Sequence, residues 1–181
     1  MNEKKEERST HRNILNITFT AMFVAIIAAL SQVSIPMPNM VPITLQTFAV
    51  LLSGYFLGFE KGTLSVLIYI LLGAVGAPVF ASFKGGFAVL LGYTGGFIWG
   101  FIPLAFLCGI RCHSKWLGII LGICGTLACH LLGALQYMIL SGRGFFESLA
   151  LVSFPYLLKD IVLVPLAYLI SSEIKKRIKY E

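Results

Sequence analysis

Long apolar runs, separated by short connections rich in polar residues, glycine or proline, dominate the sequence. Each run is close to the ~20 residues that an α-helix needs to cross the ~30 Å hydrocarbon core of a bilayer. The second run is short, and glycines and a proline interrupt the third. The pattern predicts one membrane domain, 14–172, of six transmembrane helices. These helices are expected over Ile14–Val33, Thr44–Phe59, Thr63–Phe80, Phe87–Ile110, Trp116–Leu140 and Phe154–Ser172.

Composition also indicates an all-α integral membrane protein. Hydrophobic residues make up 57% of the chain and charged residues only 12%, against about 25% charged residues in soluble proteins. A soluble domain of 181 residues could not bury this much apolar surface, so we expect the lipid bilayer of the cell (plasma) membrane to cover it. The basic residues behind the net charge of +6 lie at the chain ends and in short connections. They form no single stripe, so we expect no nucleic-acid partner.

The distribution of lysine and arginine predicts the topology. Segments 1–13 and 173–181 are polar tails, and the first apolar run is too long for a cleaved signal peptide, so it is expected to be retained as a helix. Lysine and arginine gather on the cytoplasmic side of membrane proteins. We therefore predict that both termini are cytoplasmic and that the connections "SIPMPNMVPIT", "GAPVFASFKGGF" and "SGRGFFES" face outward. This orientation places eleven of the fourteen basic residues inside: Lys4, Lys5, Arg8, Arg12, Lys61, Arg111, Lys115, Lys175, Lys176, Arg177 and Lys179.

Motifs for catalysis or metal binding are weak. Asp160 is the only aspartate, and no nucleophile motif or P-loop is present. Cys108, Cys112 and His113 lack a partner pair at metal-site spacing. We expect no metal, no cofactor and no enzymatic activity, so any ATP chemistry would belong to a partner. His130 leaves two interpretations open: a neutral histidine bonded to a backbone carbonyl in the bundle, or a polar contact near a ligand.

Lys159 and Asp160 stand side by side in the last apolar run. An ionisable residue at the centre of a transmembrane helix costs about 2.5–3.5 kcal/mol on insertion scales, so both side chains should face protein or water. Neighbours on a helix point about 100° apart, so the two are not expected to form an ideal ion pair with each other. They either link helices or line an outward-opening polar cavity. In such a cavity the lysine would meet a carboxylate and the aspartate would accept N–H donors.

Two further stretches are expected on the same outer side. "VPITLQT" carries Thr44 and Gln46, and "FASFKGGFAVLLGYTGGF" carries Ser82, Lys84 and Tyr93 among five glycines. Irregular backbone at membrane depth survives only where protein or cavity water shields it. These stretches therefore either line a site or let helices pack closely through small residues.

At these residues the chain resembles a known family. "VPITLQT" followed by "YILLGAVGAPVFASFKGGFAVLLGYTGGFIWGF" is similar to the pattern of the BioY family, the biotin-binding S components of energy-coupling-factor vitamin transporters. The resemblance covers the whole chain in length and span order and is most specific from Pro42 to Phe101. It implies a six-helix membrane subunit that captures biotin from outside. Its implied partners are a membrane T component and two cytoplasmic ATPases.

The resemblance also implies a ligand site. Biotin has a ureido group, an apolar bicycle and a carboxylate chain, and the polar pair of the sixth helix is expected to contact it. Many relatives have Gly-Pro-Thr-Gly-Gly where this chain has Tyr93 in second place, so a role for Tyr93 at the carboxylate or over the rings stays open. Lys159 or Lys84 would meet the carboxylate. The predicted ligand-binding set is Lys159, Asp160, Tyr93, Lys84, Gln46, Thr44, Ser82, Phe83 and Phe87.

A ridge of small residues on the first helix suggests a partner surface. Ala21, Ala25 and Ala29 recur at four-residue spacing, which lets another helix approach closely. By resemblance this ridge docks on the T component; alternatively it packs inside the bundle. The predicted function is a biotin-binding subunit whose outward loops close over the ligand. A self-sufficient vitamin facilitator or a small intramembrane transferase or hydrolase are the alternatives.

Overall fold

The structure is a computed structural model that describes the backbone of residues 2–178 and the side chains of residue 10 and residues 13–178. It is mostly helical, with one short hairpin. The helices are α1 (Asn2–Ser31), α2 (Gln46–Leu57), α3 (Phe59–Ala74), α4 (Phe87–Leu91), α5 (Gly95–Gly109), α6 (Lys115–Ser141), α7 (Phe145–Val152) and α8 (Phe154–Ile178), with a 3-10 turn at Ala81–Phe83. Strands β1 (Ser34–Ile35) and β2 (Ile43–Thr44) pair antiparallel between α1 and α2.

The apolar runs become helices, but several boundaries differ from those predicted. The run 87–110 divides into α4 and α5, because the backbone is extended at Gly92 (φ −83°, ψ −175°). α3 ends at Ala74 instead of Phe80, just before Gly76 takes a left-handed φ of +106°. The connection after α6 contains a helix of its own, α7. Segment 1–13, predicted as a tail, is helical from Asn2 onward.

Helix length limits how many spans can be recognised from length and composition. Within the described part of the chain, Asn13–Ser31 and Lys115–Ser141 are long and apolar enough to cross a membrane. The pair α7 and α8, bent by 55°, gives a third if it forms one broken span. α2 and α5 are apolar but shorter than a full crossing. The chain is thus an integral membrane protein, and the six-span topology stays a prediction.

Helices α5 and α6 form the most closely packed pair in the fold. A Cβ at Gly100 would lie 2.6 Å from Cys129 Cα, and one at Gly96 would lie 2.4 Å from the carbonyl oxygen of Leu132. Only glycine permits the backbones to come this close, as small residues do between membrane helices generally. This approach seats the ring of Phe97 against the middle of α6.

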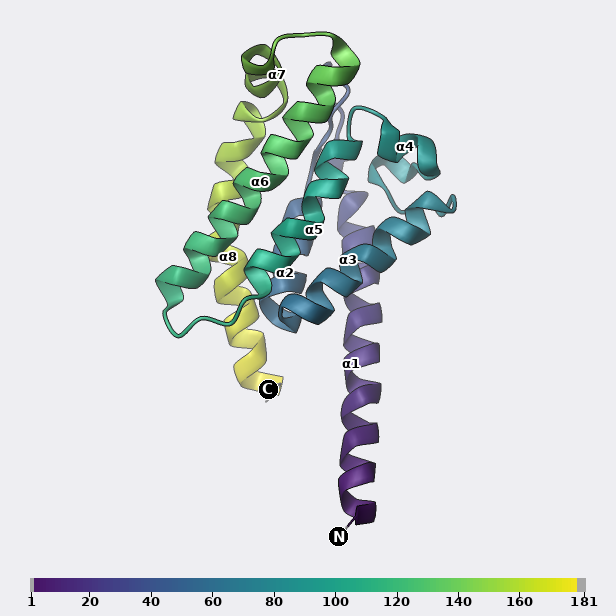
Figure 1. The fold of residues 1–181 in the computed structure, drawn as a ribbon, viewed down its shortest axis with the longest axis vertical. Coiled ribbons are helices and arrows are strands. Elements are labelled where there is room, and N and C mark those ends of the chain that lie inside the picture. The colour runs from purple at the N-terminus through teal and green to yellow at the C-terminus, as the bar shows by residue number, and fades with distance from the viewer. Residues whose placement is uncertain (1, 179–181) are drawn as a thin grey trace.

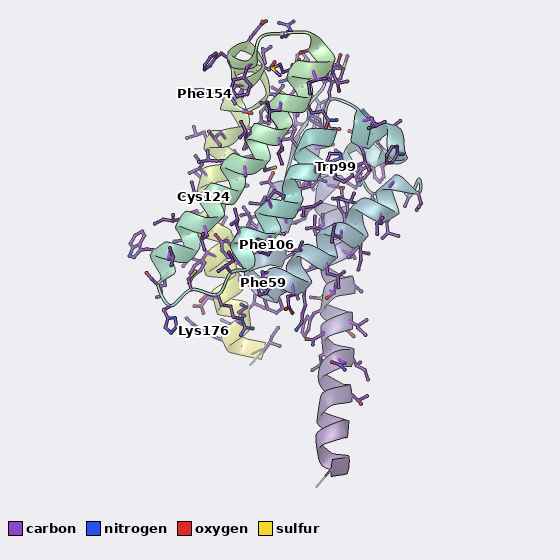
Figure 2. All side chains as sticks on the ribbon, in the orientation of Figure 1. Phe59, Trp99, Phe106, Cys124, Phe154 and Lys176 are labelled. Carbon is purple, nitrogen blue, oxygen red and sulfur yellow. The ribbon has the colours of Figure 1, made fainter. Side chains whose placement is uncertain are left out.

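The bundle separates an inner core from an apolar outer surface. α5, α6 and α8 run alongside one another, the first turns of α1 extend past the rest of the molecule, and both chain ends lie opposite α7 (Figure 1). Figure 2 shows labelled side chains on the outer faces of several helices, and Phe59, Phe106 and Phe154 are 43%, 45% and 77% exposed. Such large apolar side chains on the outside are expected where lipid takes the place of water.

Candidate ligand-binding site

A cavity opens between β2, the start of α2, the loop after α3, and helices α5, α6 and α8. It contains about 670 Å³ of space, its open mouth included. Most of the wall is apolar, with a few polar groups that converge on it, as such sites require. The lining residues are Val41, Pro42, Thr44, Gln46, Thr47, Phe80, Ala81, Lys84, Val89, Thr94, Phe97, Ile98, Phe101, His130, Tyr156, Lys159 and Asp160.

Lys159 reaches from α8 to the backbone of β2. Its Nζ donates to the carbonyl oxygen of Thr44 at 2.7 Å and lies 2.9 Å from Asp160 Oδ1. The side chain is 29% exposed, so the ammonium stays open to the cavity. A cation fixed at the mouth of an apolar cavity can attract a ligand carboxylate, because Coulomb attraction strengthens as water is excluded.

Asp160 is the most buried charged group in this wall, with a side chain only 5% exposed. The expectation that it forms no ideal ion pair with Lys159 is correct only in part, because the lysine side chain brings the two atoms to ion-pair distance. The angle is nevertheless not that of a hydrogen bond, and among the described residues Oδ1 has no hydrogen-bond partner. A buried acceptor in this state is costly unless a donor reaches it.

His130 holds the other carboxylate oxygen of Asp160. The packing of α6 against α8 brings His130 Nε2 to 3.1 Å from Asp160 Oδ2, and His130 itself is 4% exposed. The interpretation that His130 bonds a backbone carbonyl is therefore wrong. Because the carboxylate accepts, the tautomer assigned by this contact carries its proton on Nε2. Phe97 packs edge-on against the ring at 5.6 Å between centroids and fixes its plane.

Gln46 and Thr44 contribute further polar groups to the cavity wall. Gln46 Nε2 donates to Tyr69 Oη at 2.5 Å, and that hydroxyl donates in turn to the carbonyl oxygen of Val79 at 3.1 Å. Thr44 Oγ1 accepts from the backbone N–H of Gln46 at 3.3 Å. The amide of Gln46 is thus oriented by α3 before any ligand arrives, while its carbonyl oxygen remains available as an acceptor for a ligand donor.

The loop after α3 is held against the end of α1. Gln32 Nε2 donates to the carbonyl oxygen of Phe80 at 3.2 Å, and Gln32 Oε1 accepts from the N–H of Phe83 at 2.8 Å. Ser82 and Phe83 both have left-handed φ values, +59° and +56°, which is strained for residues with a Cβ. The turn points their side chains outward and returns Lys84 to the cavity wall.

Five residues of the predicted ligand-binding set share the cavity, and four do not line it. Lys159, Asp160, Lys84, Gln46 and Thr44 are together in its wall. The remaining four are Ser82, Phe83, Phe87 and Tyr93, of which the three aromatic ones are 72%, 57% and 36% exposed. Their ligand contacts stay predictions.

The aromatic wall comes from residues that sequence reasoning missed. Phe80, Phe97 and Phe101 line the cavity in place of the predicted rings. Thr94, Phe97 and Phe101 recur every three or four residues, which marks one helix face, so this spacing could have identified two of the rings. Phe80 comes from irregular backbone, where no periodicity is available.

The break between α4 and α5 is stabilised from α6. Gln136 Nε2 donates to the carbonyl oxygens of Leu90 and Gly92 at 2.9 Å and 2.7 Å. The Leu90 carbonyl lies in the last turn of α4, where carbonyls lack intrahelical donors, and the Gly92 carbonyl also accepts from the N–H of Gly95 at 3.0 Å. The bridge fixes the break at which Thr94 enters the cavity wall, while Tyr93 turns away and packs against Tyr137 at 5.3 Å between ring centroids.

The alanine ridge lies outside this site. Ala21, Ala25 and Ala29 are all exposed on α1, and Ala21 and Ala25 border an apolar groove between α1 and α3. The alternative that the ridge packs inside the bundle is therefore wrong, because exposed side chains do not pack there.

Among the residues that the structure describes, no three His, Cys, Asp or Glu side chains gather as a metal site would need.

Comparison with known proteins identifies the family. The BioY family model matches residues 2–180. The chain is 39% identical over 161 residues to the biotin transporter BioY of Thermotoga maritima, covering 86% of this chain and 92% of that protein. It is 38% identical over 161 residues to a probable biotin transporter BioY of Pyrococcus horikoshii, covering 88% and 95%. A crystal structure of the S-component for biotin from an ECF-type ABC transporter superposes with a TM-score of 0.84 at 25% identity, covering 92% of this chain and 93% of that one. The predicted resemblance is confirmed, and the chain belongs to the BioY family.

Proposed function

We propose that this protein is the substrate-binding S subunit of an energy-coupling-factor transporter and captures biotin for ATP-driven uptake. Support comes from family membership, from relatives named as biotin transporters, and from the fold shared with a biotin S-component. The observation that carries the proposal is the buried Asp160 carboxylate in the cavity wall, which His130 holds at Oδ2 and which faces the Lys159 ammonium at Oδ1 without a hydrogen bond. The family is one of transporters, so the protein is not an enzyme.

The membrane topology forms part of the proposal. We infer six crossings of the plasma membrane, with both termini in the cytoplasm and the cavity open to the outside. The excess of lysine and arginine at one end of the chain's helices supports this orientation. So does the location of both chain ends on the side opposite α7.

The chemistry of biotin matches the polar groups of the cavity. Asp160 Oδ1 lies beside the Lys159 ammonium without a hydrogen bond and suits one ureido N–H, while His130 positions the same carboxylate through Oδ2. The carbonyl of the Gln46 amide suits the second ureido N–H. Phe97 and Phe101 offer apolar faces to the bicycle. Lys84, which lines the same cavity from the loop after α3, suits the carboxylate at the far end of an extended ligand. Lys159 meets the carboxylate only if the ligand chain folds back, because its Nζ lies 2.9 Å from Asp160 Oδ1.

The partners are a membrane T component and two cytoplasmic ATPases. The chain has no P-loop with which to hydrolyse ATP itself. The exposed ridge of Ala21, Ala25 and Ala29 gives a second membrane helix room for close approach. We therefore place the T component on this face of α1.

Binding of radiolabelled biotin to the purified full chain in detergent tests the proposal. Saturable binding, displaced by unlabelled biotin and not by other vitamins, is expected. Absence of binding by correctly folded protein would contradict it. Uptake by cells that lack the ATPase partners would instead support a self-sufficient facilitator.

Competition with biotin methyl ester identifies the lysine at the carboxylate. If Lys159 meets it, Lys159→Met weakens biotin binding strongly but changes methyl ester binding little, because the ester carries no charge. Lys84→Met is the matched variant, since Lys84 also lines the cavity but its side chain is exposed and lies in the loop after α3. The opposite selectivity pattern would assign the carboxylate to Lys84.

A further inference from the structure

A second cavity lies at the other end of the bundle, between the end of α2, the loop joining α5 to α6, and the last turns of α8. It contains about 980 Å³ of space, its mouth included. Lys175 and Arg111 line it together with Tyr55, Tyr168 and Cys112. Lys175 follows Lys159 by 16 residues on α8, or about 24 Å along a helix, so this cavity is separate from the candidate biotin site. Figure 2 shows Phe154 and Lys176 at the two ends of that helix.

The two cations of this second cavity have no carboxylate partner in the part of the chain that the structure describes. Neither Lys175 nor Arg111 forms an ion pair with any described side chain. The nearest acidic residue on α8, Glu173, is bonded at 2.6 Å to Lys176 on the exposed side of the helix. Burial and then the neighbouring guanidinium of Arg111 lower the pKa of Lys175, so a half-buried ammonium lies near an exposed guanidinium.

Helix-end electrostatics alone do not explain this arrangement. Basic residues in the last turn of α8 complement the helix dipole wherever their side chains point. Lys176 and Arg177 fit that account, because both are exposed. Lys175 is half-buried and lines the cavity with Arg111, which comes from a different element. Two cations facing one cavity repel each other unless an anion lies between them.

We propose that this cavity is a binding site for a phosphate-bearing anion, held by Arg111 and Lys175. A planar guanidinium matches the oxygens of a phosphate, and a lysine ammonium adds a point charge. The Tyr168 phenol, whose ring stands edge-on to Tyr55 at 5.3 Å, lines the cavity and offers a further O–H donor. In a membrane protein the same chemistry fits an anionic lipid headgroup, for which basic pockets between helix ends are suited, or a free phosphate.

Charge-matched variants distinguish this site from a general basic surface. Lys175→Gln and Arg111→Gln remove charges that line the cavity. Arg177→Gln and Lys115→Gln remove the same charges from exposed positions at the same end of the molecule that do not line the cavity. Biotin binding and the unfolding temperature of each variant report on folding independently of the phosphate ligand, so failure here is separable from failure of the proposed transport role.

The probe is dioleoyl phosphatidylglycerol, titrated into the detergent-solubilised full chain and followed by native mass spectrometry. Phosphatidylcholine, whose choline group cancels the phosphate charge, is the neutral comparison. We expect saturable phosphatidylglycerol binding that weakens about tenfold in each cavity variant, the usual loss for one hydrogen bond to a charged group. The two exposed-position variants should change it less than threefold.

The outcomes separate the sources of the phosphate. Displacement of phosphatidylglycerol by millimolar inorganic phosphate supports a site for a free phosphate, and resistance to displacement supports a site for a lipid headgroup. The proposal is overturned if the parent chain binds neither phosphatidylglycerol nor inorganic phosphate saturably. Equal weakening in all four variants would also overturn it, because that result describes a diffuse basic surface. Lys175→Arg, which keeps the charge, should retain binding.

Discussion

The contacts among Lys159, Asp160 and His130 predict how substitutions that neutralise the lysine and the aspartate combine. The loss of folding stability in the double variant should be smaller than the sum of the losses in the two single variants. Lys159→Met leaves the Asp160 carboxylate, only 5% exposed, with His130 as its remaining partner. Asp160→Asn leaves an ammonium on a side chain that is 29% exposed and still bonded to the carbonyl of Thr44. The Lys159→Met/Asp160→Asn chain carries neither charge.

The distances and exposures set the expected magnitudes. At 2.9 Å and an effective dielectric constant of about 20 the two charges attract by roughly 6 kcal/mol, much of it offset by their desolvation. Removing one partner of a buried pair typically costs 3–5 kcal/mol. We expect about 3 kcal/mol for Lys159→Met, because His130 still holds one oxygen. Asp160→Asn should cost about 1–2 kcal/mol, because the remaining ammonium reaches water in the cavity. The double variant should lose no more than the worse single one.

A double-mutant cycle in detergent measures this coupling. Unfolding of the parent, both single variants and the double variant is followed by intrinsic fluorescence, with biotin binding measured on the same preparations. The double variant should regain stability but not biotin binding, since the groups that contact ligand are gone. A coupling free energy below about 1 kcal/mol, or single variants as stable as the parent, would refute the ion-pair argument.

Three other predictions concern the site, its partner surface and its loops. His130→Leu should weaken biotin binding more than His130→Gln, because glutamine keeps a donor for Asp160; equal losses would argue against a positioning role. Ala25→Trp should abolish co-purification with the T component and spare biotin binding, whereas Leu131→Trp, exposed on α6, should do neither; intact assembly of Ala25→Trp would move the docking surface. Spin labels at Met40 and Ser82, both exposed, should give a distance distribution that narrows or shifts when biotin binds. Unchanged distributions would remove the predicted gate.

The sequence was sufficient for the family and the helical class but not for helix ends. Apolar runs fix which segments become helices, since in lipid each backbone N–H must find its acceptor within the segment. The break at Gly92 depends on Gln136, which is 44 residues away and supplies the donors for two carbonyls. No pattern in the local sequence predicts such a distant contact, so the run 87–110 was predicted as one helix.

In the candidate site, too, some residues could be predicted from the sequence and others could not. Lys159 and Asp160 could be predicted because a charged side chain inside an apolar run is energetically costly and therefore indicates a functional or structural role. His130 could not be assigned, because its partner was set by the packing of α6 on α8 and not by spacing along either helix. Phe83 and Phe87 were chosen from the most distinctive stretch, yet the left-handed turn at Ser82 directs that loop outward.

The shortness of α2 has a consequence for biosynthesis. Twelve residues make a helix of about 18 Å, well under the ~30 Å thickness of the hydrocarbon core. Only Gly58 separates α2 from α3, and a Cβ at Gly62 would lie 2.8 Å from Gly54 Cα, so the two helices are in contact from their first shared turn. We expect α2 to be unable to leave the translocon for lipid until α3 has been made. The two helices would then enter the bilayer as a single hairpin, and a nascent chain in which α2 but not α3 has left the ribosome would be anchored by α1 alone.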